Sequence, residues 1–192
     1  MRAIVLNGAC GGDDFTEQAA VETTTHLAGM NWEVEHVVLR DREIAPCIGC
    51  FGCWVRTPGE CVRDDEASRI AASVIQSDLV VYVTPVVFGG YSYELKKFMD
   101  RAISLLLPFF TRVDGEVHHV PRYEQIPRLL ALGTLSAADP EMEKTFKWLV
   151  SRNAINLSSP AHLAEVIVSD QDHLNERIAL VLAAVLEGEI TA

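Results

Sequence analysis

Short apolar runs alternate with amphipathic segments along most of the chain. Runs rich in β-branched residues and closed by Gly, Asn or Pro predict strands covered on both faces, and the clearest is the DLVVYVT run at 78–84. Longer segments with apolar residues on one side predict helices. The predicted strands are 3–6, 32–39, 78–84, 129–132 and 162–168, and the predicted helices are 16–28, 65–76, 93–106, 141–153 and 172–187.

This order repeats a β-α unit five times, which predicts a parallel sheet with helices on both faces. Right-handed crossovers leave few topologies. Five strands fit the flavodoxin-like α/β order 2-1-3-4-5, which places a ligand at the carboxyl ends of strands one and three. We therefore predict a single doubly wound domain over residues 1–192. It carries a cysteine-rich insertion at 41–64 and a long, proline-containing connection at 107–127.

Composition and charge argue against membrane and nucleic-acid partners. The chain has 192 residues, of which 49% are hydrophobic, and a formal net charge of −11. Its apolar runs are far shorter than the roughly 20 residues of a membrane span, and its N-terminus does not resemble a signal peptide. These features predict a cytoplasmic protein without a membrane partner. No basic stripe is present, so we expect no nucleic-acid partner.

The loop after the first predicted strand reads Asn-Gly-Ala-Cys-Gly-Gly at 7–12. Glycines before a helix suit a phosphate group, but the spacing matches neither G-x-G-x-x-G nor a G-K-[ST] loop. A monophosphate such as that of FMN and a plain glycine turn both remain open. Asp13 and Asp14 would repel a phosphate, unless they face solvent and cap the helix.

The loop after the third predicted strand contains flat, apolar and glycine residues that could line an aromatic ring. The alternative is an ordinary βα turn. The run TPVVFGGYSYELKKFMDR at 84–101 resembles the NADPH-dependent FMN reductase family, where this loop cradles the isoalloxazine ring of FMN. The resemblance implies flavin contacts from the following residues: Thr84, Pro85, Val86, Val87, Phe88, Gly89 and Gly90.

The same resemblance extends, more sparsely, to two other loops. Asn7 and Gly8 match the opening of the family's phosphate loop, and Thr16 matches a later position in it. The family's serine and arginine in that loop are missing here. The third flavin loop would begin at Gly133, after the fourth predicted strand.

Four cysteines form the pattern Cys47-x2-Cys50-x2-Cys53-x7-Cys61. Compact spacing of four thiolates suits an iron–sulfur cluster, whereas zinc usually takes two separated C-x2-C pairs. The pattern is similar to that of iron–sulfur flavoproteins, which implies a 4Fe–4S cluster beside FMN. A cluster, free thiols and zinc all remain open.

A flavin carries hydride and single-electron chemistry itself, so no catalytic side chain is required. We predict an FMN-binding oxidoreductase that moves electrons from NAD(P)H to a small or protein acceptor. The alternatives are an iron–sulfur flavoprotein that only carries electrons, and a flavodoxin-like module that has lost FMN. We also expect a homodimer or homotetramer, with the last helix and the segment 107–127 as contact surfaces.

Overall fold

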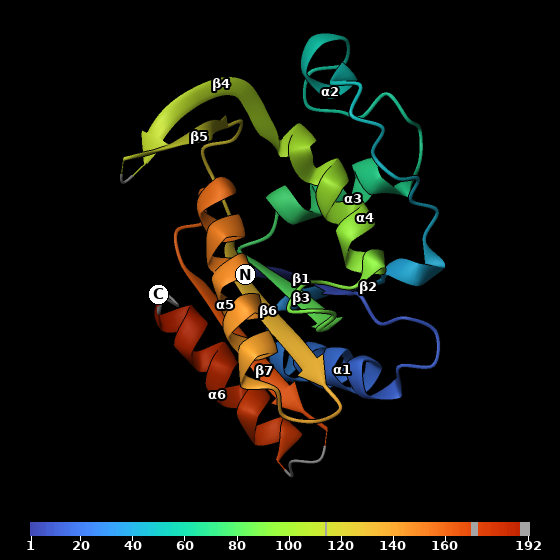
Figure 1. Ribbon diagram of the computed structural model, residues 1–192, viewed down its shortest axis with the longest axis vertical. Helices are drawn as coiled ribbons and strands as arrows, with labels where there is room; N and C mark the ends of the chain where they lie inside the picture. The colour runs from blue at the N-terminus through green and yellow to red at the C-terminus, as the bar shows by residue number, and fades with distance from the viewer. Residues whose placement is uncertain (114, 170–172, 189–192) are drawn as a thin grey trace.

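The computed structural model describes residues 1–113, 115–169 and 173–188. Its centre is a five-stranded parallel sheet in the order β2-β1-β3-β6-β7 (Figure 1). With two hairpin strands left out of the count, this order is 2-1-3-4-5, and the predicted flavodoxin-like fold is confirmed. The sheet strands are β1 (Arg2–Asn7), β2 (Glu33–Val38), β3 (Leu79–Pro85), β6 (Arg128–Leu135) and β7 (His162–Val168).

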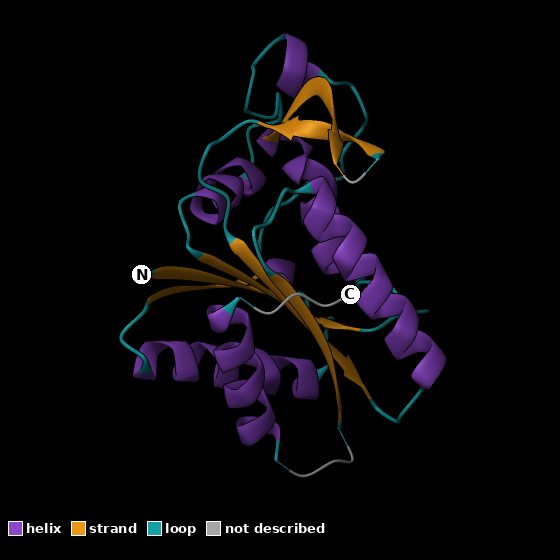
Figure 2. Ribbon diagram, turned by 90° about the vertical axis from the view of Figure 1, so that its left-hand side faces the viewer, coloured by secondary structure: helices purple, strands orange, loops and turns teal. Residues whose placement is uncertain are grey.

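Helices cover both faces of the sheet (Figure 2). Side chains alternate along β1, so Ile4 and Leu6 enter one core while Ala3 and Val5 enter the other. One face carries α1 (Asp14–Gly29) and α6 (Leu174–Glu187), and the other carries α3 (Glu66–Ile75), α4 (Tyr93–Arg101) and α5 (Pro140–Asn156). The short helices are η1 (Leu39–Asp41), α2 (Gly52–Val55) and η2 (Ala102–Leu105).

The segment predicted as a long connection contains an antiparallel hairpin, β4 (Leu106–Val113) and β5 (Glu116–Pro121). The sequence analysis predicted a connection without strands because the segment contains prolines. Pro121 ends β5, and Pro108 falls where the pairing register shifts between Leu106 and Phe110, which are positions that tolerate proline in a sheet.

The helix predicted at 93–106 is shorter than expected. It ends at Arg101 and continues as the 3-10 helix η2. Side chains from distant segments bind the carbonyls that follow: Arg122 donates from Nε to Ser104 O (3.0 Å) and Trp54 donates from Nε1 to Leu106 O (3.0 Å). These bonds favour the turn into β4 over further helix.

The strand predicted at 129–132 extends to Leu135, because residues 133–135 continue the pairing with β7. The predicted start of the last helix, residue 172, lies outside the described residues, and α6 is described from Leu174. Among the described residues, no helix is both long and apolar enough to cross a membrane.

Candidate functional site

The first loop is clamped onto β3 and α4. The N–H of Gly8 donates to Val83 O (2.7 Å), and the hydroxyl of Ser92 donates to Gly8 O (2.6 Å). A Cβ on Gly8 would lie 2.9 Å from the Cβ of Leu95, so no larger residue fits without a shift. The side chain of Asn7 accepts a hydrogen bond from Ala9 N (2.9 Å), which stabilises the turn. The two family positions Asn7 and Gly8 therefore shape this loop.

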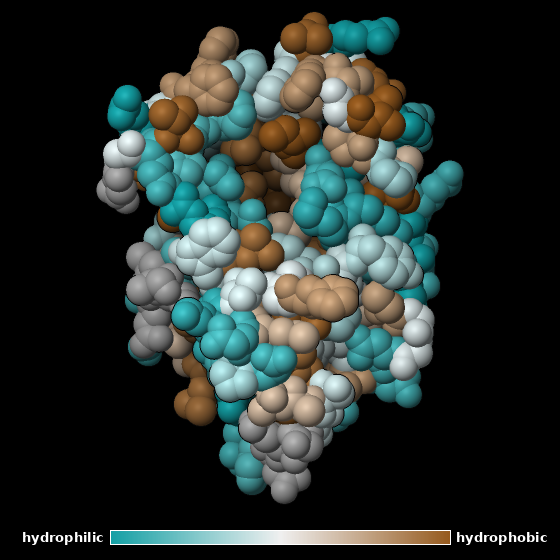
Figure 3. Space-filling view, viewed as in Figure 1, coloured by the Kyte–Doolittle hydropathy of each residue, from teal (hydrophilic) through white to brown (hydrophobic). Residues whose placement is uncertain are grey.

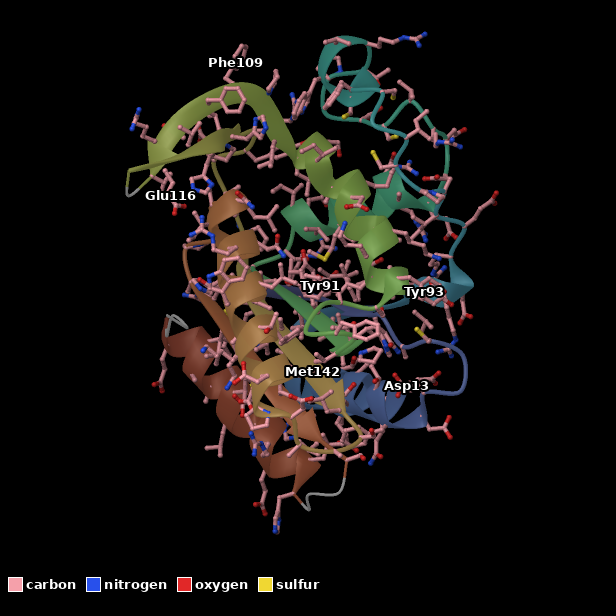
Figure 4. All side chains as sticks on the ribbon, viewed as in Figure 1. Asp13, Tyr91, Tyr93, Phe109, Glu116 and Met142 are labelled. Carbon is pink, nitrogen blue, oxygen red and sulfur yellow. The ribbon has the colours of Figure 1, made fainter. Side chains whose placement is uncertain are left out.

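The N-terminus of α1 is capped by a carboxylate. Asp13 accepts from Thr16 N (3.2 Å) and from the Thr16 hydroxyl (2.5 Å), and Figure 4 shows Asp13 at this end of the helix. The capping alternative raised from the sequence is confirmed for Asp13. Burial, then the charges of Glu94 and Asp13, raises the pKa of the Cys10 thiol. The Asp13 carboxylate occupies the N-terminus of α1, where a phosphate would otherwise bind.

Three hydroxyls tie the predicted flavin loops together at the carboxyl edge of the sheet. The Thr134 hydroxyl lies 2.5 Å from that of Thr16 and 3.4 Å from Thr84 O, while Thr84 Oγ1 accepts from Ser92 N (3.0 Å). Thr134 belongs to the third predicted flavin loop, which begins at Gly133, but the sequence analysis gave it no separate role. The signal for such a role was a hydroxyl near the end of an apolar strand, at the edge where the topology places a ligand.

The loop after β3 forms a tight turn. Val87 and Gly90 exchange backbone hydrogen bonds (3.0 and 2.9 Å), and both central residues have positive φ, 50° at Phe88 and 76° at Gly89. A Cβ on Gly89 would lie 2.6 Å from Thr145 Cγ2, so the turn and its close approach to α5 both require glycine. The Gly90 N–H is used within the turn. Phe88, 91% exposed, is the part of the loop most open to a flat ligand.

Gly133 lies inside β6 rather than in the loop that follows it. A Cβ there would meet Val86 Cγ2 at 2.6 Å and Phe146 Cε1 at 2.9 Å. Close packing against Val86 and Phe146 therefore explains why residue 133 is glycine. Its predicted flavin contact stays a prediction.

All four clustered cysteines line one cavity of about 550 Å³. Figure 3 shows the hollow in the upper half of this face, with apolar side chains inside. Cys47 and Cys50 are exposed, Cys61 is intermediate and Cys53 is buried. Within residues 1–113, 115–169 and 173–188, no three His, Cys, Asp or Glu side chains are close enough to hold a metal ion. The thiols share a cavity without forming a finished metal site, and the predicted metal role stays a prediction.

The predicted flavin loop and the cysteine cavity lie at opposite ends of α4. Ser92 caps the helix beside the flavin loop, and Met99 and Arg101 at the other end line the cavity. Nine residues at about 1.5 Å each give a separation of roughly 13 Å along the axis. The chain therefore offers two distinct regions rather than one merged site.

Two tyrosines, the buried Tyr82 and the half-buried Tyr91, lie between these regions. The rings of Tyr82, which lines the cavity, and Tyr91, which follows the flavin loop, meet edge to face with centroids 6.3 Å apart. Tyr91 accepts from Asn153 Nδ2 (3.0 Å), and Figure 4 places it centrally. Burial raises the pKa of Tyr91 to about 12 and that of Tyr82 still further. Both hydroxyls therefore stay protonated near neutral pH.

A buried ion pair anchors the cysteine segment, which is the cysteine-rich insertion at 41–64. Arg101 donates to both carboxylate oxygens of Asp65 (2.7 and 2.9 Å) and to Ala45 O (2.6 Å). Asp65 also caps α3 by accepting from Ala67 N (3.1 Å), as the predicted helix start required. Burial works to lower the pKa of Arg101, but hydrogen bonding to Asp65 and the charges of Cys61 and Asp65 hold it above its usual range. The guanidinium is therefore a fixed positive charge in the cavity wall.

These loops belong to a recognisable sequence pattern. A sequence model of the family described as NADPH-dependent FMN reductase matches residues 1–121, more than half of the chain. The chain belongs to the NADPH-dependent FMN reductase family. This confirms the resemblance drawn from the run at 84–101.

Curated relatives are named iron–sulfur flavoproteins. One from Methanocaldococcus jannaschii is 32% identical over 112 residues, which cover 58% of this chain and 57% of the relative. One from Methanosarcina thermophila is 32% identical over 74 residues, 38% of each chain. The matched part therefore spans little more than half of the first relative and less of the second.

Solved structures share the whole fold at low sequence identity. An NAD(P)H:quinone oxidoreductase from Methanothermobacter marburgensis superimposes with a TM-score of 0.68 at 12% identity, covering 96% of this chain and 94% of that one. An azoreductase from Bacillus anthracis str. Sterne gives 0.63 at 13% identity, covering 98% and 96%. At this identity the likeness concerns the fold alone.

Proposed function

We propose that the protein is an FMN-dependent oxidoreductase that takes electrons from a reduced nicotinamide and passes them to a small-molecule or protein acceptor. The observation that carries the proposal is the clamped pair of loops at the carboxyl ends of β1 and β3. Gly8, Ser92 and Thr84 hold these loops together at the switch point where ligands bind in such sheets. Family membership agrees with a flavin at this edge.

The flavin would be held mainly at its ring. The exposed tip of the loop at 84–90 faces solvent, and the loops from β1 and β6 lie beside it. The phosphate end fits less well, because the Asp13 carboxylate occupies the N-terminus of α1. When bound, FMN supplies the hydride and electron chemistry, and the protein binds and orients it.

We further propose that Cys47, Cys50, Cys53 and Cys61 hold a 4Fe–4S cluster. Their chemistry suits the group, since all four thiols line one cavity beside a buried guanidinium. The names of the curated relatives give independent support. The thiols must move closer to one another to bind it.

The test is anaerobic purification followed by visible spectroscopy, iron and sulfide assays, and NAD(P)H oxidation assays on the same sample. The proposal expects bound flavin, about four irons per chain and nicotinamide oxidation that depends on FMN. Flavin and cluster without nicotinamide oxidation would favour the electron carrier. A protein that binds no added FMN would contradict the oxidoreductase proposal.

A matched pair of variants locates the flavin. Phe88→Ala removes an exposed ring from the loop tip, and Trp148→Ala removes an exposed ring from α5. We expect weaker FMN binding only in Phe88→Ala, with unchanged melting temperatures in both. Equal FMN affinity in the two variants would count against the loop as the flavin site.

We also propose that the chain self-associates through the hairpin. Phe109, Phe110 and Val117 are large apolar residues exposed on β4 and β5 (Figure 4 labels Phe109). Clustered exposed apolar residues mark contact surfaces. Sedimentation or light scattering should give a dimer or tetramer, and a monomeric mass at micromolar concentration would contradict this.

A further inference from the structure

Arg101 carries a buried donor that no group in the described part of the chain satisfies. Its side chain is 2% exposed and lines the cysteine cavity. Nη1 and Nη2 bind Asp65 and Ala45, but Nε has no hydrogen-bond partner among the residues that the structure describes. Buried donors in proteins are almost always paired, so an unpaired one calls for an explanation.

The surroundings of Arg101 restrict what the missing partner is. The guanidinium always carries its charge, so the partner must be an acceptor, and an anionic one is favoured. Cys47, Cys50, Cys53 and Cys61 line the same cavity as Arg101. A centre held by these four cysteines would therefore bring anionic sulfur acceptors to the wall that Arg101 forms.

We propose that Arg101 is a positioning residue that directs its Nε–H to the sulfurs of the centre held by the four cysteines and raises the reduction potential of that centre. This rests on the proposed cluster. One-electron reduction adds a negative charge to the centre without making or breaking a bond. A nearby positive charge and a hydrogen bond to sulfur stabilise that added charge, and both are established determinants of cluster potentials.

Because Arg101 pairs with Asp65, the proposal predicts reduction-potential shifts of opposite sign for variants of the two residues. Arg101→Gln removes the positive charge and should lower the potential. Arg101→Lys keeps the charge but removes Nε–H, so it should lower the potential less. Asp65→Asn keeps a helix-capping side chain and removes the negative charge beside Arg101, so it should raise the potential. A purely structural anchor would not give shifts of opposite sign.

The experiment is an anaerobic redox titration of the full-length, iron- and sulfide-reconstituted protein, followed by electron paramagnetic resonance. We expect the reduction equilibrium of Arg101→Gln to move at least about tenfold toward the oxidised form, which is about 59 mV for one electron. Arg101→Lys should shift the same way by less, and Asp65→Asn the opposite way. Arg69→Gln, an equal charge change at an exposed pair on α3, should leave the potential unchanged.

The outcomes separate this inference from the proposed function. Wild-type potentials in fully loaded Arg101→Lys and Asp65→Asn variants would overturn the inference while leaving the cluster in place. Shifts in the same direction for both variants would also overturn it. A wild-type protein that takes up no iron would overturn the cluster and the inference together, as the iron assay would show directly. If Arg101→Gln fails to fold, the two conservative variants carry the test.

Discussion

The carboxyl edge of the sheet and the cysteine segment are built in different ways. At the sheet edge, backbone and buried hydroxyls of three loops bind one another, through Gly8, Ser92 and Thr134. The cysteine segment instead projects above α4 (Figure 1) and is held largely by side chains, notably Arg101 and Trp54. Sheet topology therefore shapes the first region directly, whereas a few long side chains decide where the second one lies.

Breaking the anchor of the cysteine segment should have the largest effect. Arg101→Met leaves the carboxylate of Asp65 buried without its partner, and we expect a loss of about 3–5 kcal/mol in the free energy of unfolding. Urea denaturation measures it. Arg69→Met is the control, because its exposed pair with Glu66 is screened by solvent and should contribute little to the free energy of unfolding. Equal stability of the two variants would show that the segment does not depend on the buried pair.

Crowding the sheet edge should have a smaller effect on stability. Gly133→Ala places a Cβ within 2.6 Å of Val86 and 2.9 Å of Phe146, and overpacking of this kind costs about 1–3 kcal/mol. The displaced Val86 belongs to the proposed flavin loop at 84–90, so FMN affinity should fall as well. Gly29→Ala is the control, because nothing lies within 4 Å of a Cβ there. Unchanged FMN affinity in a destabilised Gly133→Ala variant would separate packing from binding at this position.

The strand order could be predicted from the sequence, whereas the side-chain contacts that hold the cysteine segment could not. Strand order and the loop at 84–90 follow from local patterns, because apolar runs and glycine turns are encoded over a few residues. The ion pair between Asp65 and Arg101 joins positions 36 apart, and the hydrogen bond of Trp54 reaches Leu106. Contacts between positions so far apart in the sequence cannot be predicted from a local pattern. The hairpin was missed for a related reason, since its strands are exposed and lack the buried run that marks the sheet strands.

The tyrosine pair between the two regions predicts alkaline instability. The folded-state pKa of Tyr91 is raised to about 12, against about 10 in an unfolded chain. Its contribution is fully present below pH 10 and is lost as pH rises toward 12, at about 1.4 kcal/mol per pH unit. Thermal melts in that window should show a shallower pH slope for Tyr91→Phe than for wild type. The control is Tyr123→Phe, at an exposed residue, and an equal slope in both variants would contradict the burial argument.

The smallest expected effect concerns Asp13, at the phosphate end of the proposed flavin site. Asp13→Asn keeps a capping side chain and removes a negative charge from the N-terminus of α1, where a phosphate would bind. We expect FMN to bind about fivefold more tightly, or about 1 kcal/mol, while riboflavin, which lacks the phosphate, binds as before. Asp13→Ala should show the same gain but lose about 1 kcal/mol of stability with the cap.

Fluorescence titration with both flavins measures this difference. A ratio of FMN to riboflavin affinity that is the same in wild type and Asp13→Asn would mean that the phosphate does not approach α1. The flavin would then be held by its ring alone, at the loop whose exposed tip is Phe88. A changed ratio would instead show that both ends of the sheet edge contact the flavin, and that Asp13 weakens one of them.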